Sequence, residues 1–123
     1  MNTPRPSFDD WLDELKRDPT APRIGMYLMH NGVVRATTRD GASAVTGMDL
    51  TYDRDTLRAA IAAAEASPGI FAVRVGINEG RLAVGDDIMR VLVGGDIREH
   101  VFDALRELVR TIKTTCVKEG ELR

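Results

Sequence analysis

The sequence contains few of the residues from which disulfides and metal sites are built. Its 123 residues include a single cysteine, Cys116, so no disulfide can form within the chain. Only two histidines, His30 and His100, accompany this cysteine, and the three residues do not form a ligand pattern typical of zinc. We therefore expect no disulfide, no metal site and no cofactor.

The chain also lacks a surplus of positive charge. Lysine and arginine together number 17, against 19 aspartates and glutamates, which gives a net charge of -2. Nucleic-acid-binding domains usually carry a basic surplus, so this class is disfavoured and we expect no nucleic-acid partner. Any site for an anion must then be a local cluster of cations.

Long apolar segments are missing as well. No stretch approaches the roughly 18 apolar residues of a membrane-spanning helix, and the N-terminal residues MNTPRPSFDD lack the apolar core of a signal peptide. Together with the single cysteine, these absences predict a cytoplasmic protein that has no membrane partner.

What the sequence does contain is the pattern of one small α+β domain. After a flexible leader at residues 1–6, residues 7–123 predict helices and strands in alternating groups, which favours a single domain. Apolar spacing and alanine content predict three helices: one capped by Ser7 and ending before Pro19, one over 53–66 and one over 97–114. Strands are predicted over 25–38, 44–52, 70–77, 81–84 and 87–94. Asn31-Gly32 is either a hairpin turn or a bulge within one longer strand.

The third predicted helix has an apolar stripe on one side and basic residues on the other. Arg106 and Arg110 have acidic neighbours one helical turn away, so we interpret them as members of surface ion pairs. Cys116 either continues the stripe as a small apolar residue or is a redox-sensitive thiol close to cations. Lys113 and Lys118 would point about 140° apart on a continuous helix, so they can converge only if the helix ends between them.

Three other residues have simple structural interpretations. Trp11 continues the apolar face of the first helix, and we expect it in the core and not as a platform for a ligand. We expect His100 on the solvated side of the last helix and His30 in a turn or at a strand edge, because lone histidines are seldom sites.

Three motifs resemble one known protein family. The first is a glycine pair followed by Val-Arg, the second is the turn GRLAVGDD, and the third lies on the last helix. The matching residues are Gly25, Gly32, Val34, Arg35, Gly80, Leu82, Gly85, Asp86, Asp87, Arg98, Phe102, Lys113 and Thr114. In order and spacing, from about Ser7 to Glu119, the chain resembles the MoaE-like family of molybdopterin synthase large, catalytic subunits.

This resemblance implies a fold and a reaction. The fold is α+β, an α/β hammerhead-like domain with an added antiparallel β-subdomain. The family moves sulfur from the thiocarboxylate at the C-terminus of a ubiquitin-like small subunit onto cyclic pyranopterin monophosphate, which forms molybdopterin. The implied partners are that small subunit, the pyranopterin substrate and a second copy of the chain, as a homodimer within a heterotetramer.

The resemblance also implies which residues form the site. Arg35 and Arg98 would bind the anionic substrate, because a guanidinium holds phosphate with two parallel hydrogen bonds. Lys113 and Lys118 would be catalytic, with Lys113 buried among cations so that its pKa is lowered and it can act as a base or nucleophile. We expect Arg35, Arg98 and Lys113 to meet in one small electropositive cavity.

The chain departs from the family at several site positions, and the departures leave other functions open. Ile97 stands where the family has a histidine, Ile77-Asn78 stands where it has His-Arg, and the segment between the two lysines lacks Pro-Phe-Trp. The alternative function is a catalytically degenerate paralogue that acts as a dimeric module for binding an anion or a protein tail. A third possibility is an unrelated α+β interaction domain.

Overall fold

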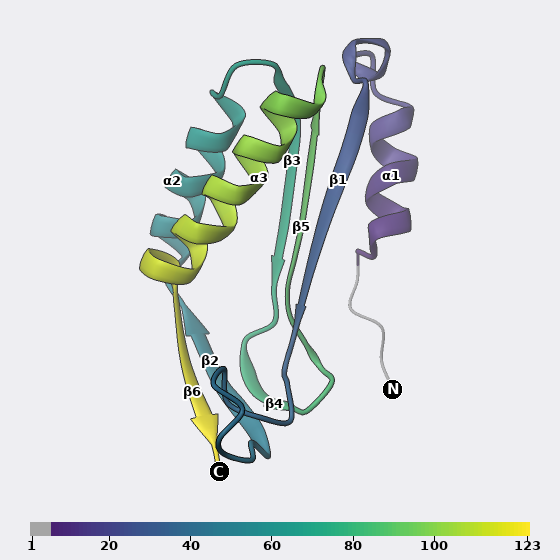
Figure 1. Cartoon of the computed structure of the whole chain (residues 1–123). Coiled ribbons are helices and arrows are strands. Elements are labelled where there is room, and N and C mark those ends of the chain that lie inside the picture. The colour runs from purple at the N-terminus through teal and green to yellow at the C-terminus, as the bar shows by residue number, and fades with distance from the viewer. Residues whose placement is uncertain (1–5) are drawn as a thin grey trace.

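The computed structural model describes residues 6–123, which contain two three-stranded antiparallel sheets and three α-helices (Figure 1). The long sheet has the strand order β1 (Met26–Val33), β5 (Asp87–Gly95), β3 (Ile70–Ile77). The short sheet has the order β4 (Gly80–Ala83), β2 (Gly47–Tyr52), β6 (Val117–Leu122). The predicted leader at 1–6 lies, apart from Pro6, outside the described residues.

The helices cover the long sheet from both sides (Figure 1). Helix α1 (Phe8–Lys16) lies on one face, while α2 (Arg54–Glu65) and α3 (Arg98–Thr111) lie on the other. Side chains alternate across β5, so Leu92 packs with Trp11 of α1, whereas Val91 and Val93 join the larger core under α3. This arrangement confirms the predicted α+β class and the core position of Trp11.

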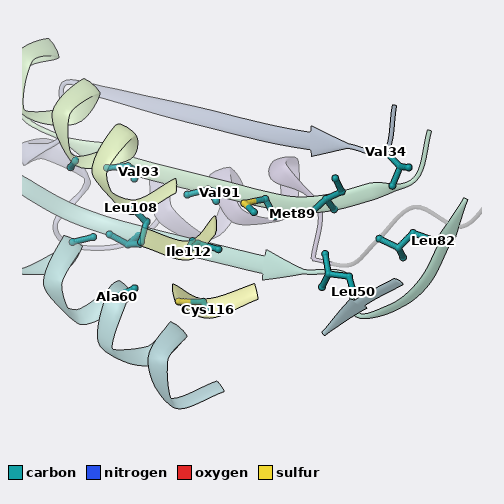
Figure 2. Close-up of a cluster of buried hydrophobic side chains, with 14 of the residues drawn as sticks. Val34, Leu50, Ala60, Leu82, Met89, Val91, Val93, Leu108, Ile112 and Cys116 are labelled. Atoms are coloured by element: carbon teal, nitrogen blue, oxygen red, sulfur yellow. The ribbon is translucent and has the colours of Figure 1, made fainter. Parts of the chain in front are cut away.

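The larger core continues from the long sheet into the short one (Figure 2). Its fully buried side chains include Val91 and Val93 of the long sheet, Leu50 of the short sheet and Ile112 at the end of the α3 region. A single apolar layer therefore fixes the short sheet against α3 and the long sheet, and with it the region where their ends meet.

Two helix starts agree with the residues that predicted them. The backbone N–H of Asp10 donates to the Ser7 hydroxyl at 3.1 Å, and the Ser7 N–H donates to the Asp10 carboxylate at 2.8 Å, which makes a complete capping box. Asp53 caps α2 by accepting from the N–H groups of Asp55 and Thr56 at 2.9 and 3.0 Å.

The strand predicted over 25–38 is too long. Asn31 and Gly32 lie inside β1, and the pairing with β5 shifts between Gly32 and Val33, so the bulge is present and the hairpin alternative is wrong. Beyond Val33 the chain leaves the long sheet because Val34 exchanges hydrogen bonds with the β4–β5 turn, at Asp86 O (3.0 Å) and Gly85 N (2.8 Å). The next strand accordingly begins at Gly47 instead of 44.

The C-terminal region differs most from the prediction. Helix α3 ends at Thr111, a π-helical turn follows over Ile112–Cys116, and the final residues form β6, a strand that the sequence did not predict. The residues KEGEL have no apolar alternation, and they become a strand because they pair with β2, where Thr51 lies opposite Lys118. The helix therefore does end between Lys113 and Lys118.

Candidate active site

A recess lies where the end of β1, the π-helical turn and β6 meet. It has a volume of about 200 Å³ and is lined in part by the buried residues Val34 and Met48. Its charged lining residues are Arg35, Arg39, Lys113, Glu119 and Glu121. We call this cavity the Lys113 recess. Arg35 and Lys113, which are far apart in the sequence, thus line the same cavity.

The charge in this recess is mixed. Two carboxylates oppose three cations, and Lys113 Nζ lies 3.6 Å from a Glu119 carboxylate oxygen. The Lys113 side chain is 49 % exposed, so it is neither buried nor surrounded only by cations, which were the two conditions for its expected activation. The recess can attract an anion, and Glu119 competes with that anion for Lys113.

The π-helical turn sets the direction of Lys113. Ile112 and Cys116 point into the core, while the hydroxyls of Thr114 and Thr115 donate to the carbonyls of Arg110 and Thr111 at 2.9 and 2.7 Å. Insertion of a π turn rotates the residues after α3 relative to a continuous α-helix, and Lys113 then lies over the junction of the two sheets. The buried Cys116 confirms the apolar interpretation of this residue (Figure 2).

Arg98 does not reach this recess within one chain. It is the first residue of α3 and exposed, and Lys113 follows it fifteen residues later. At 1.5 Å per residue this spacing amounts to roughly 22 Å along the helix, so one chain cannot bring Arg35, Arg98 and Lys113 together. The expectation that these three cations meet within the chain is therefore wrong for Arg98.

Lys118 lines a different recess. That cavity, of about 430 Å³, is bordered by residues 51–53 and 114–118, and Lys118 belongs to it while Lys113 does not. The separation follows from strand geometry, because successive residues of β6 point to opposite faces: Glu119 points to the Lys113 recess and Lys118 points away from it.

The charge of Lys113 acts on His30, which the sequence did not reveal. It is half-buried in β1; burial lowers its pKa below the ordinary value, and the positive charge of Lys113 lowers that pKa further. One signal in the sequence could have indicated that His30 faces the core side of the sheet. It lies two residues after Leu28, which packs against the core, and alternate residues of a strand share a face. His30 therefore senses the charge of Lys113, although it does not line the recess.

The start of α3 has its own polar cluster. His100 Nδ1 lies 2.7 Å from the carboxylate of Asp96, which also accepts from the Ile97 N–H at 2.7 Å. Hydrogen bonding to His100, and more weakly to Ile97, holds the pKa of Asp96 below its ordinary value. The position that opens the helix is occupied by Ile97, which is 50 % exposed and supplies no imidazole.

The predicted ion pairs along α3 are present. Arg106 lies 3.2 Å from Asp103, and Arg110 lies 2.6 Å from Glu107. All four side chains are exposed, so these pairs contribute little to stability, and they carry no part of the site.

Within residues 6–123, no group of histidine, cysteine, aspartate and glutamate side chains is arranged to hold a metal ion. The helices of this part of the chain also lack the combination of length and apolar composition that a bilayer-spanning helix requires.

The fold and the site define an α+β protein with two antiparallel sheets and, at their junction, a recess lined by cations and carboxylates. The family model described as MoaE protein matches residues 7–115. Because the match covers most of the chain, this chain belongs to the MoaE protein family. Among curated proteins, no sequence matches it.

Solved structures of this fold are similar to the chain over nearly its whole length. A molybdopterin synthase from Staphylococcus aureus has a TM-score of 0.75 and 15% identity, covering 96% of this chain and 86% of that chain. A molybdopterin biosynthesis MoaE protein from Burkholderia ambifaria has a TM-score of 0.73 and 22% identity, covering 94% and 82%. A complex of subunits 1 and 2 of the Helicobacter pylori molybdopterin-converting factor has a TM-score of 0.68 and 13% identity, covering 92% and 76%. At these identities the likeness shows the fold.

Proposed function

We propose that the chain is the large subunit of a molybdopterin synthase and acts in molybdenum cofactor biosynthesis. In this role it transfers sulfur from the thiocarboxylated tail of a ubiquitin-like small subunit to cyclic pyranopterin monophosphate. Membership of the MoaE family supports the role in this pathway. The observation that carries the proposal is the pairing of Arg35 and Lys113 in one recess, since both occupy positions of the family motifs.

The two cations have different tasks in this proposal. The guanidinium of Arg35 binds the substrate phosphate through paired hydrogen bonds, which a planar fork favours. The ammonium of Lys113 stabilises negative charge on the thiocarboxylate, and on the carboxylate that forms when water cleaves the acyl–sulfur bond and the sulfur stays on the substrate. Lys113 must exchange its ion pair with Glu119 for the substrate, and the 3.6 Å separation makes that pair weak enough to exchange.

Arg98 contributes to substrate binding through a second copy of the chain. It lies too far from the Lys113 recess of its own chain, so it can contact substrate only in the recess of a partner within a homodimer. Ile97 and Phe102, beside Arg98 on the same end of α3, are 50 % and 44 % exposed, as expected of residues that a partner covers. The Helicobacter pylori complex of two subunits supports the small subunit as a further partner.

Lys118 and the location in the cell complete the proposal. Lys118 lines the neighbouring recess at the π-helical turn, where it can contact the small subunit's tail as that tail approaches Lys113. The single cysteine and its burial are consistent with a reducing, cytoplasmic setting.

The second candidate function is the degenerate paralogue, a dimer that binds an anion or a protein tail without turnover. Two observations favour it: Lys113 is paired with Glu119, and Ile97 supplies no imidazole. In that case substrate would bind at the same recess and remain unchanged.

Reconstitution separates the two functions. The protein is mixed with a thiocarboxylated small subunit and the pyranopterin precursor, and molybdopterin is measured. We expect product, and we expect Lys113→Ala to lower its rate by about 100-fold or more, as removal of a charge-stabilising group does. Lys16→Ala, which removes an exposed lysine from α1, is the matched control and should keep full activity. Precursor binding without product would instead support the degenerate paralogue.

A further inference from the structure

A second cavity lies on the α1 face of the long sheet. It has a volume of about 370 Å³, within the usual range for small-ligand sites. Its lining includes Trp11, Arg74, Asn78, Asp87 and Arg90, and among the described residues it shares none with the Lys113 recess. We call it the Arg90 cavity.

The cavity exists because α1 is shorter than the sheet that it covers. Nine helical residues span roughly 13 Å, whereas the eight residues of β1 span roughly 27 Å. In Figure 1, α1 runs beside the part of β1 that lies away from β4 and ends before β1 does. The apolar packing under α1 stops at Leu92, and two residues earlier on the same face β5 carries Arg90.

Arg90 is buried although it is charged. It is 7 % exposed, and the only other buried polar residue within residues 6–123 is Thr38. Its guanidinium lies 4.9 Å from the Trp11 ring centroid, a cation–π arrangement. Gly76, opposite Arg90 on β3, makes room for the group, because a Cβ there would lie 2.9 Å from Arg90 Nη2.

The guanidinium is only partly satisfied by protein groups. Among the described residues, it donates from Nη1 to the carbonyl of Pro6, and its Nε lies 3.9 Å from an oxygen of Asp87. The other Asp87 oxygen accepts from the Asn31 amide at 3.1 Å. A guanidinium has five N–H donors, so donors remain for an acceptor that enters the cavity.

The charges around the cavity favour a singly charged anion over a doubly charged one. Arg74, the second cation of the lining, lies 2.7 Å from Glu14. The two arginines are thus balanced by Asp87 and Glu14, and one additional negative charge leaves a smaller imbalance than the two charges of phosphate. A carboxylate also matches the planar fork of arginine.

We propose that the Arg90 cavity binds the carboxylate of a small organic acid, with Arg90 as the buried anchor and Arg74 as the second cation. The carbon part of the ligand lies against the Trp11 indole, which lines the same cavity. This site lies on the face of the sheet opposite α3, and its function does not depend on the sulfur transfer proposed for the Lys113 recess.

Trp11 provides the test, because it is the only tryptophan in the chain. Its fluorescence is followed while sodium acetate or sodium propionate is added, with sodium chloride at equal ionic strength as the reference and inorganic phosphate as a separate arm. We expect a saturable change with the carboxylates. An equal response to chloride, a response to phosphate alone, or no saturable response would overturn the proposal.

Variants locate the binding. Arg74→Gln should weaken carboxylate binding about tenfold, because it removes a charge-assisted contact from a side chain that is one-third exposed. Arg90→Gln should abolish binding, with circular dichroism to confirm folding. Arg58→Gln is the control: Arg58 also pairs with one carboxylate, Asp55 at 2.9 Å, but lies on α2 outside the cavity. Equal loss in Arg58→Gln and Arg74→Gln would contradict the assignment even if Arg90→Gln did not fold.

Discussion

The two faces of the long sheet are built differently. On the face of α2 and α3, apolar side chains form one continuous core that extends into the short sheet. On the face of α1, the buried cluster among residues 6–123 consists of Trp11, Leu15, Ala72 and Leu92, and a charged residue, Arg90, follows directly. The comparison teaches that a short covering helix leaves part of a sheet free to hold polar groups. On the opposite face, where two helices cover the sheet, the continuous core holds in place the ends of the strands and of the helix that surround the Lys113 recess.

Leucine truncations on the two faces sharpen this comparison most strongly. Leu108→Ala, in the larger core at 2 % exposure, should lower the free energy of unfolding by about 3 to 4 kcal/mol, because the surrounding elements cannot close the cavity. Leu15→Ala on α1 should cost about 2 kcal/mol, since a short helix can shift into the space. Urea unfolding measures both values. A larger loss for Leu15→Ala would contradict the proposed difference.

A smaller effect is expected at the start of α1. Ser7→Ala removes the hydroxyl that accepts the Asp10 N–H, so it should lower the free energy of unfolding by about 1 kcal/mol. Because α1 carries Trp11, fraying of its first turn should also change the fluorescence of Trp11 under native conditions. Thr46→Ala, which removes a hydroxyl from an exposed residue outside the helices, is the control and should leave this fluorescence unchanged.

The smallest effect is expected in the pH dependence of stability, on the face of the long sheet that α3 covers. Burial, and then the charge of Lys113, hold the pKa of His30 below its usual value of 6.5. Between the lowered folded-state pKa and pH 6.5 the native state therefore binds fewer protons than the unfolded chain, so stability is lost as the pH falls through the folded-state pKa. His30→Asn should remove this part of the acid loss, measured as the melting temperature at neutral and mildly acidic pH. An unchanged pH dependence would exclude His30 as its source.

Much of the fold could be predicted because local signals and tertiary structure agree. The caps of α1 and α2, the strands over 70–77 and 87–94, and the core position of Trp11 all follow from periodicity and capping residues. Strand β6 could not be predicted, because KEGEL carries no strand pattern and is a strand only through its pairing with β2. The end of β1 at Val33 likewise depends on contacts with residues 85 and 86.

The candidate site was predictable only in part. The family motifs identified Arg35 and Lys113, and the structure places both on one recess. The position of Arg98 could have been excluded from helix geometry alone, since fifteen helical residues separate it from Lys113. Arg90 was overlooked, although a lone arginine within the apolar run IMRVLVG of β5 is an unusual position for a charge.

The central claim is that substrate binds between Lys113 of one chain and Arg98 of another, and mixing two variants tests it most directly. Lys113→Ala and Arg98→Ala should each form little molybdopterin alone. After the two are unfolded together and refolded, mixed dimers carry one intact site, so activity should return to about a quarter of the unmutated level. No recovery in the mixture, or full activity of Arg98→Ala alone, would contradict the shared site.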